Sequence, residues 1–381
     1  MNAIKVQKDI IQSGLVELFD DKIVLVDIFT SIKQVFPEEI DWVEGNNDGH
    51  WRTGEYLVFY LKNFESAIYR VGEEIECVAK FPFSIDAYSA GNRFFIGRKI
   101  NENSEIEAFY KINADGFSVT ELKELSLLKF PFLTGTFAFG QFVFLQKDRM
   151  TEKAPFHIVV YDDKNEQVIA ELSEELNPYT VTYKHIFLLH LTNHTLIAGW
   201  NGDYFGGYPP RLLSIDLHTK AVKDLVLFDD FIEQPIAFPH EGCSSQIPEV
   251  TVNSFSYDPV SNCLVCLFKT GVYWFDLTTM SGRYELFPDE FLPNYLLAAT
   301  GGHLFGDHIY FVSTVRGAFV PDVKQSSLGA FNIRTGKLDW HYHFPVDYVT
   351  NSLHPPKANE YYIVAKDAEQ RLHIFEKQKP S

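Results

Sequence analysis

Residues 328–344, LGAFNIRTGKLDWHYHF, hold the stretch that decides the fold. Two runs rich in apolar and aromatic residues flank a short polar segment, and this pattern predicts a β-hairpin. Gly336 lies in the polar segment, where a tight turn needs a residue that tolerates a positive φ. The stretch therefore predicts two antiparallel strands joined by a tight turn.

The same unit recurs along the chain. Further hairpins are expected at 66–81, 105–122, 156–172, 211–228 and 271–287. Their onsets lie about 39 to 60 residues apart, near or above the length of a propeller blade. Additional strands are expected upstream of the hairpins, at 57–61, 93–99, 135–146, 186–200, 251–269 and 303–315. Each unit then holds about four strands, which predicts an all-β propeller with four-stranded antiparallel blades.

The two ends of the chain complete the ring. Residues 361–378 hold two or three strands, and residues 3–10 can supply the missing outer strand. Pairing these ends removes a seam with unpaired strand edges. Six full hairpins and this shared blade predict a seven-bladed propeller, with the chain 1–381 as a single domain.

Residues 11–50 leave an alternative open. The segment 14–29 resembles another hairpin, and SIKQVFPEEI at 31–40 resembles a short helix. An eight-bladed ring and an embellished first blade both fit this region. The stretch 45–56 reads as a loop, either an exposed tip or a loop packed under the first blade.

Composition narrows the class of partner. Aromatic residues make up 15% of the chain, which favours strands over helices. The formal net charge of −18 would repel phosphates, so we expect no nucleic-acid binding. An acidic surface is compatible with a basic partner protein.

The N-terminal stretch and the cysteines point to a compartment. The sequence shows neither a secretory signal nor an apolar run long enough to cross a membrane. Four cysteines are too few for a disulfide framework in a chain of this length. We therefore expect a cytoplasmic protein without membrane contact. A mature secreted form whose signal has been removed is the alternative.

One repeat carries a family resemblance. Residues 330–340, AFNIRTGKLDW, resemble the quinoprotein-type (PQQ-like) propeller repeat A-x-D-x-x-T-G-K-x-x-W, with Asn332 in place of the usual aspartate. The segments 216–220 and 276–279 match it in part and lack the tryptophan. The resemblance implies that Trp340 docks between blades. It implies no quinone cofactor, because the repeat is structural and the adjacent cysteine pair that such dehydrogenases often carry is missing.

Candidate catalytic and metal groups are sparse. Cys263 and Cys266 form a C-x-x-C spacing inside a strand, which puts the two side chains on opposite faces and favours buried packing. His341 and His343 share a strand face, and decoration of the solvent side is the favoured interpretation. Hydrolase, metalloprotease and phosphate-loop motifs do not occur. We therefore predict no catalytic residue, no metal ligand and no cofactor.

The long connections give a more useful signal. Residues 200–210 and 316–327 join the second and third strands of their units, and 229–250 and 288–302 join one unit to the next. In antiparallel blades both kinds of connection emerge on the same face of the ring. Long loops on a rigid scaffold often bind partners. We predict a binding surface on this face, formed by Trp200, Asp203, Tyr204, Tyr208, Arg211, Asp229, Asp230, Glu233, His240, Glu241, Asp289, Glu290 and Arg316.

These observations favour a non-enzymatic scaffold of WD-repeat-like architecture that binds a basic protein through an acidic, aromatic-bearing face. A specific version is a bacterial immunity protein that inhibits a basic toxin. The alternative is a propeller enzyme, either a carbohydrate-active hydrolase or lyase or a metal-dependent esterase. Its site would lie at the channel mouth and use carboxylates such as Asp203, Asp230 or Glu241. A glycan-binding propeller is a third interpretation, and the poorly matched repeats argue against it.

Overall fold

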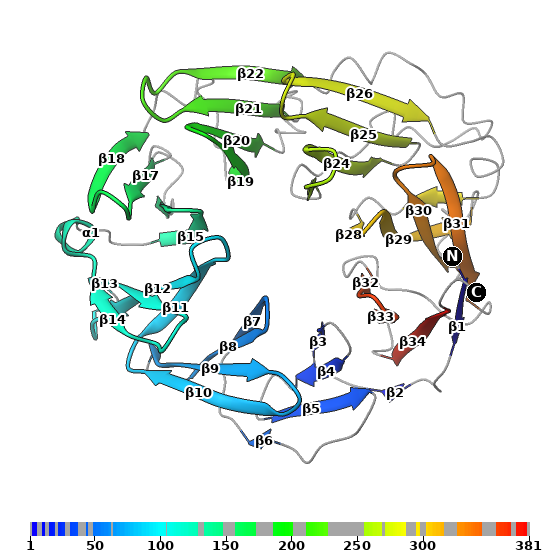
Figure 1. Cartoon of the computed structure of the whole chain (residues 1–381), viewed down its shortest axis with the longest axis horizontal. Helices are drawn as coiled ribbons and strands as arrows, with labels where there is room; N and C mark the ends of the chain where they lie inside the picture. Colours follow the sequence, from blue (N-terminus) through cyan, green and yellow to red (C-terminus); the bar gives the residue numbers. More distant parts are fainter. Residues whose placement is uncertain are drawn as a thin grey trace.

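The computed structural model describes most of the chain. The described residues are 2–5, 10–11, 15–19, 22–26, 31–36, 43–44, 49–61, 64–103, 105–128, 133–147, 157–172, 186–200, 211–227, 255–268, 271–286, 295–297, 302–315, 326–344, 356–366 and 371–378. Their strands form eight antiparallel sheets, which stand around a ring as the blades of a propeller (Figure 1).

Blades 1 to 4 follow one another along the chain. Blade 1 contains β3 (Leu15–Leu18), β4 (Ile23–Val26), β5 (Ser31–Phe36) and β6 (Val43–Glu44). Blade 2 contains β7 (Gly49–Thr53), β8 (Tyr56–Tyr60), β9 (Ser66–Val71) and β10 (Ile75–Phe81). Blade 3 contains β11 (Ser84–Ser89), β12 (Phe94–Ile100), β13 (Ile106–Asn113) and β14 (Val119–Glu121), followed by the short helix α1 (Lys123–Leu127). Blade 4 contains β15 (Leu133–Phe139), β16 (Phe142–Lys147), β17 (His157–Asp162) and β18 (Gln167–Leu172).

Blades 5 to 8 complete the ring. Blade 5 contains β19 (Ile186–Thr192), β20 (Thr195–Trp200), β21 (Arg211–Asp216) and β22 (Val222–Leu227). Blade 6 contains β23 (Ser256–Asp258), β24 (Cys263–Phe268), β25 (Gly271–Asp276) and β26 (Ser281–Leu286). Blade 7 contains β27 (Tyr295–Leu297), β28 (His303–Phe305), β29 (His308–Val315), β30 (Ser326–Asn332) and β31 (Lys337–His343). Blade 8 contains β32 (Lys357–Ala358), β33 (Tyr362–Lys366), β34 (Arg371–Gln378), β1 (Asn2–Lys5) and β2 (Ile10–Ile11).

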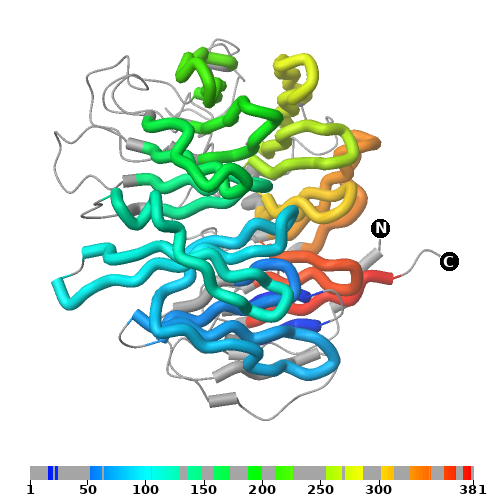
Figure 2. The backbone as a smooth tube through the Cα atoms, turned by 60° about the vertical axis from the view of Figure 1, so that its left-hand side comes forward, coloured from blue at the N-terminus to red at the C-terminus, as the bar shows by residue number. Residues whose placement is uncertain are grey.

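The seven blades that the sequence predicts are all present, as blades 2 to 8. Blade 1 adds an eighth sheet in the region where the sequence left an eight-bladed ring open. The ring closes as predicted, because β1 pairs with β34 as the outer strand of blade 8. Figure 2 shows the hairpins of successive blades following one another around the ring.

Two local predictions in the first part of the chain are wrong. The segment expected to be a helix at 31–40 contains the strand β5, whose register sets Ile32 against Val26. The stretch expected to be a loop at 45–56 contains β7, which pairs with β8. In both cases the free edge of a neighbouring strand offers backbone hydrogen bonds, and this tertiary pairing overrides a weak local preference.

The core is divided among the seams, which are the spaces between adjacent blades. Among the described residues each seam holds one cluster of buried apolar side chains. Blade 1 contributes to two of them, with Leu18 packed toward blade 8 and Phe19 toward blade 2. These contacts make blade 1 a full member of the ring.

Trp340 illustrates how a seam is filled. Its ring lies between blades 7 and 8, where its centroid is 5.3 Å from that of Phe375 in an edge-to-face arrangement. Only 8% of Trp340 is exposed. The docking of this tryptophan between blades, which the repeat implies, is confirmed.

In blades 5 to 7 the turn after the third strand is shaped by an aspartate or asparagine. Asp216, Asp276 and Asn332 each accept hydrogen bonds from the backbone amides two and three residues later. Such Asx turns fix the backbone of a tight hairpin. Gly336 completes the turn of blade 7 with a φ of +68°, as the sequence predicts. Among the described residues there is no helix that could cross a membrane.

Candidate functional site

The predicted binding surface lies largely outside the described residues. The predicted residues in this group are Asp203, Tyr204, Tyr208, Asp229, Asp230, Glu233, His240, Glu241, Asp289, Glu290 and Arg316. The strands that bound their segments are described, and their order agrees with the predicted topology. Residues 201–210 join the second and third strands of blade 5, and the segment after β22 leads into blade 6.

Trp200 and Arg211 are the two predicted residues that the structure describes. They are cross-strand partners at the ends of β20 and β21. Only 8% of the Arg211 side chain is exposed, and its Nη1 atom donates to Asp224 Oδ2 over 2.9 Å. Arg211 therefore anchors the strand end beside residues 201–210 through a contact within blade 5.

The opposite face of the ring carries the short turns. In each of blades 3 to 7 the third strand ends in an aspartate or asparagine, called here the Asx position. The backbone amide of the next residue donates to a carbonyl in the turn between the first and second strands. The donors and acceptors are Ala114 and Arg93, Asp163 and Gln141, Leu217 and His194, Leu277 and Asn262, and Ile333 and Asp307. These bonds measure 2.8 to 3.1 Å. They place the two turns of every such blade at equivalent positions.

The side chains at these equivalent positions can be compared blade by blade. One side chain belongs to the residue whose carbonyl accepts the repeated backbone bond. The other belongs to the residue that follows the one whose amide donates it. In blades 3, 6 and 7 the two side chains bond each other, as Arg93 with Asp115, Asn262 with Thr278, and Arg334 with Asp307. In blade 4, Gln141 bonds Asp162 instead.

Blade 5 has two histidines at the equivalent positions. The ring centroids of His194 and His218 are 4.1 Å apart, with an angle of 49° between the ring planes. Both residues are exposed. Neither imidazole has a hydrogen bond to another residue in the described part of the chain.

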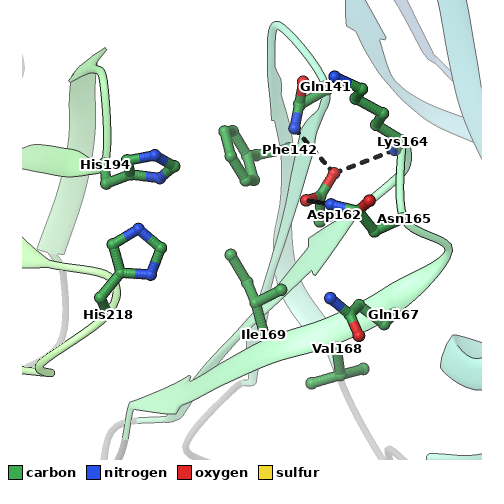
Figure 3. A pocket seen from close by; sticks show the side chains of 10 residues that line it. All are labelled: Gln141, Phe142, Asp162, Lys164, Asn165, Gln167, Val168, Ile169, His194 and His218. Carbon is green, nitrogen blue, oxygen red and sulfur yellow. Dashed lines mark hydrogen bonds between the residues drawn. The ribbon is translucent and has the colours of Figure 1, made fainter.

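The two histidines border a cavity in the seam between blades 4 and 5. Its volume is about 480 Å³. Figure 3 shows the two imidazoles on one side, Phe142 and Ile169 between, and the polar side chains of blade 4 on the other side. The remaining lining residues are Gln141, Asp162, Lys164, Asn165, Gln167 and Val168. The cavity therefore offers amides, a carboxylate and imidazoles around an apolar floor.

Asp162 is the buried polar group of this cavity. It is 5% exposed and accepts from the Gln141 side chain over 2.9 Å, from the Lys164 amide over 3.0 Å and from the Asn165 side chain over 2.6 Å. These bonds compensate its desolvation, since a buried carboxylate needs hydrogen-bond donors. Asp162 organises the turns of blade 4.

The seam between blades 6 and 7 is closed by an arginine. Arg334 Nη2 donates to Asp258 Oδ1 over 2.7 Å, Nη1 donates to Asp258 Oδ2, and Nε donates to Asp307 Oδ1 over 2.8 Å. The Asp258 side chain is 2% exposed. Burial raises the pKa of Asp258, but hydrogen bonds from Arg334 and Ser261 outweigh it and lower the pKa to about 2. A buried bidentate pair of this kind links the two blades.

The seam between blades 4 and 5 has no equivalent carboxylate. Asp258 is the last residue of the first strand in blade 6, and in blade 4 this position is Phe139. An apolar ring gives a cation no hydrogen-bond acceptor. His218, which stands where blade 7 has Arg334, instead faces His194.

Burial also shifts the pKa values of Asp86 in blade 3 and Lys377 in blade 8. Burial raises the pKa of Asp86 to about 6, although Arg98 Nε lies 2.8 Å from its Oδ2 atom. Burial also lowers the pKa of Lys377 to about 8. The Lys377 ammonium donates to the Asn359 carbonyl and lies 4.5 Å from the centroid of the Tyr310 ring.

The predicted role of the cysteine pair is confirmed. Cys263 and Cys266 lie in β24 and are 8% and 1% exposed. Cys263 packs in the seam toward blade 7 and Cys266 in the seam toward blade 5. His341 and His343 both lie in β31, as expected, and His341 is exposed.

The sequence carries a signal for the histidine pair. The turn 216–220 is a partial repeat, and His194 lies in the strand segment 186–200. Aligning the turns of successive blades by their Asx positions would have placed His194 and His218 at the paired positions. The cavity itself depends on side-chain packing across a seam, which a single blade's sequence does not show.

Comparisons with known proteins agree on the fold. No family model and no curated protein sequence matches the chain. The computationally designed Ika8 protein is 11% identical, with 96% of this chain and 98% of that chain covered and a TM-score of 0.51. The WD40 domain of SCAP from fission yeast is 10% identical, with coverage of 98% and 95% and a TM-score of 0.50.

A structure from an analysis of two prolyl endopeptidases is 12% identical to this chain. The match covers 94% of this chain and 55% of that one, with a TM-score of 0.51. A designed protein, a WD40 domain and an endopeptidase thus share this architecture. Similarities at this level of identity show the fold alone, and one fold supports unrelated functions.

Proposed function

We propose that the chain is a protein-binding propeller without catalytic activity, acting as one domain over residues 1–381. Its partner is a basic protein. The partner binds the face that carries the long connections of blades 5 to 7. The short turns of the opposite face stabilise the ring.

The charge of the long connections carries this proposal. The chain has a formal net charge of −18. Residues 229–250 contain Asp229, Asp230, Glu233, Glu241 and Glu249 and have no lysine or arginine. Residues 288–302 contain Asp289 and Glu290, again without a basic residue. Complementary potentials speed the encounter with a basic protein and disfavour acidic competitors.

The aromatic content of the same connections adds to the proposal. Residues 200–211, WNGDYFGGYPPR, hold four aromatic side chains between the paired ends of β20 and β21. Aromatic side chains are frequent anchors of protein interfaces. Arg211 supports this loop through its bond to Asp224. We propose Trp200, Tyr204 and Tyr208 as the apolar part of the interface and Asp203 as an acidic group among them.

The finer form of the proposal is a cytoplasmic bacterial immunity protein that covers a basic toxin. Acidity and the propeller scaffold support it. The repeat at 330–340 supports descent from quinoprotein-like propellers in which the repeat has kept only its structural role.

The test is affinity capture from a native lysate at low and high salt, followed by mass spectrometry. We expect one basic protein to be recovered at low salt and to be lost at high salt, because salt screens exposed charges. The triple variant D229A/D230A/E233A should lose it at low salt as well. Isothermal titration with the purified partner then measures the affinity of each form.

A matched variant controls for net charge. E73A/E74A/E76A removes the same number of exposed carboxylates from the short turn of blade 2 and the adjoining start of β10, on the opposite face. This variant should retain the partner. Equal losses in both triple variants would mean that only total charge matters, and they would contradict a binding face at the long connections.

A further inference from the structure

We propose that His194 and His218 form a binding site for a divalent late transition-metal ion, Cu²⁺, Ni²⁺ or Zn²⁺, at the seam between blades 4 and 5. The two imidazoles supply two ligands, and water supplies the others. This site lies on the short-turn face, so the inference does not rest on the proposed partner at the long connections.

The first argument is the departure of blade 5 from blades 3, 6 and 7. Blades 3, 6 and 7 have complementary hydrogen-bonding side chains at the equivalent positions. Two imidazoles can each act as a donor or an acceptor, yet the rings of His194 and His218 do not bond each other at a centroid separation of 4.1 Å. A cation bound between the two imidazoles would join rings that make no hydrogen bond to each other.

The second argument is the availability of the ring nitrogens. Within the described residues, neither ring donates to or accepts from another group, and both residues are exposed. They border a cavity of about 480 Å³ that can hold coordinated water. Phe142 meets the His194 ring edge-to-face at 6.2 Å between centroids and limits the space into which that ring can turn.

The third argument is the rigid backbone beneath the pair. The Leu217 amide donates to the His194 carbonyl over 2.9 Å and fastens the two turns together. Asp216 accepts from the amides of His218 and Thr219, which fixes the turn that carries His218. A site whose ligands are held in place before binding loses less entropy when the ion arrives.

Ligand chemistry sets the choice of ion. Imidazole suits copper, nickel and zinc, whereas magnesium and calcium prefer oxygen ligands. The Irving–Williams order predicts the highest affinity for Cu²⁺. No group of three or more His, Cys, Asp or Glu side chains gathers as a metal site in the described part of the chain. Two protein ligands therefore predict exchangeable binding.

The experiment is a titration of the purified chain with Cu²⁺, Ni²⁺, Zn²⁺ and Mg²⁺ by isothermal calorimetry. We expect one saturable Cu²⁺ site, weaker Zn²⁺ binding and none for Mg²⁺. H194Q and H218Q should each lower the Cu²⁺ affinity by at least about tenfold, because each leaves a single imidazole without chelation. In the double variant H194Q/H218Q, the loss of Cu²⁺ binding free energy should not exceed the sum of the losses in the two single variants.

H341Q is the matched control, since it removes an exposed histidine from the outer strand β31. It should bind Cu²⁺ like the unchanged chain. Circular dichroism of each variant checks folding. Pulsed electron paramagnetic resonance of the unchanged chain should show coupling of Cu²⁺ to two imidazole nitrogens, independently of any variant.

Three results would overturn the site. The first is the absence of saturable Cu²⁺ binding, and the second is unchanged affinity in both H194Q and H218Q. The third is coupling to fewer than two imidazole nitrogens. An equal loss in H341Q would assign the ion to the outer strand of blade 7 and would also contradict the proposal.

Discussion

The seam between blades 6 and 7 and the seam between blades 4 and 5 have the same backbone arrangement. They differ in the side chains at the short-turn face. In the first, Arg334 crosses from blade 7 to the buried Asp258 of blade 6. In the second, His218 stands at the equivalent turn position and meets His194 within its own blade. One seam is closed by a buried ion pair, and the other keeps a cavity.

This difference shows that the same backbone arrangement can end in a closed seam or in a seam with a cavity. The repeated turn-to-turn hydrogen bond sets the positions of the side chains in blades 3 to 7. The side chains then decide whether a seam is locked. A carboxylate at the end of the first strand of blade 6 locks it, whereas Phe139 at that position in blade 4 leaves the facing side chain free for other contacts.

Removing the arginine of the closed seam should have the largest effect. R334Q leaves the Asp258 carboxylate buried without its bidentate partner, and loss of one partner of a buried pair costs about 3 kcal/mol of unfolding free energy. Urea denaturation should show this decrease in stability.

The control for that variant is R93Q in blade 3. Arg93 and Asp115 occupy the same repeated positions, but their side chains are 50% and 78% exposed. Solvent screens exposed pairs, which contribute little to stability, so R93Q should barely shift the transition. Equal losses in R334Q and R93Q would show that burial of Asp258 is not what makes the closed seam strong.

Acid should have the second-largest effect, because it weakens the closed seam between blades 6 and 7. The pKa of Asp258 falls from 3.8 to about 2 on folding, so its contribution is present above the unfolded pKa and is lost as the pH falls through the folded pKa. The shift corresponds to about 2 kcal/mol, lost mainly between pH 4 and pH 2. Urea denaturation across this range should show the loss in the unchanged chain. In D258N the unfolding free energy should fall less steeply as the pH decreases. An identical dependence on pH would contradict the assignment to Asp258.

A smaller effect on stability is expected from a substitution at the cavity between blades 4 and 5. Q141A removes one of the three donors to the buried Asp162, and the other two remain. We expect a loss of about 1 kcal/mol in urea denaturation. K164A keeps the backbone donor and removes an exposed side chain, so it should be near neutral. A large loss in K164A would mean that the ammonium, rather than the amides, stabilises this turn.

The smallest change is expected for the histidines in the absence of metal. H194Q/H218Q alters two exposed rings without mutual hydrogen bonds, and surface substitutions of this kind shift stability by about 0.5 kcal/mol or less. Thermal melting in the presence of a chelator should therefore match the unchanged chain. A clear destabilisation would mean that ring packing at this seam contributes to the fold.

Much of the fold could be predicted from the sequence, because hairpin patterns report local structure. The stretch 328–344 gave its strands, its Gly336 turn and the docking of Trp340, each from a residue type with a physical preference. Blade 1 was harder. Its short strands have weak patterns, and β5 is a strand because it pairs with β4.

The candidate site was less predictable. The sequence predicts long acidic connections on one face and leaves open what they bind. The histidine pair and its cavity arise from two turns and a seam, and the adjacency of His194 to His218 follows from the hydrogen bond between Leu217 and His194. Only a comparison among blades shows that this pair differs from its equivalents.

The pairing of β1 with β34 has a consequence for how the molecule is made. A ribosome synthesises β1 before β34, so the ring stays open until β34 has emerged. This contact has the longest sequence separation of any strand pairing among the described residues, and such contacts form slowly. Latching of the first strand onto the last blade is then the late step of folding, and until it occurs blade 8 offers an unpaired edge to other nascent chains.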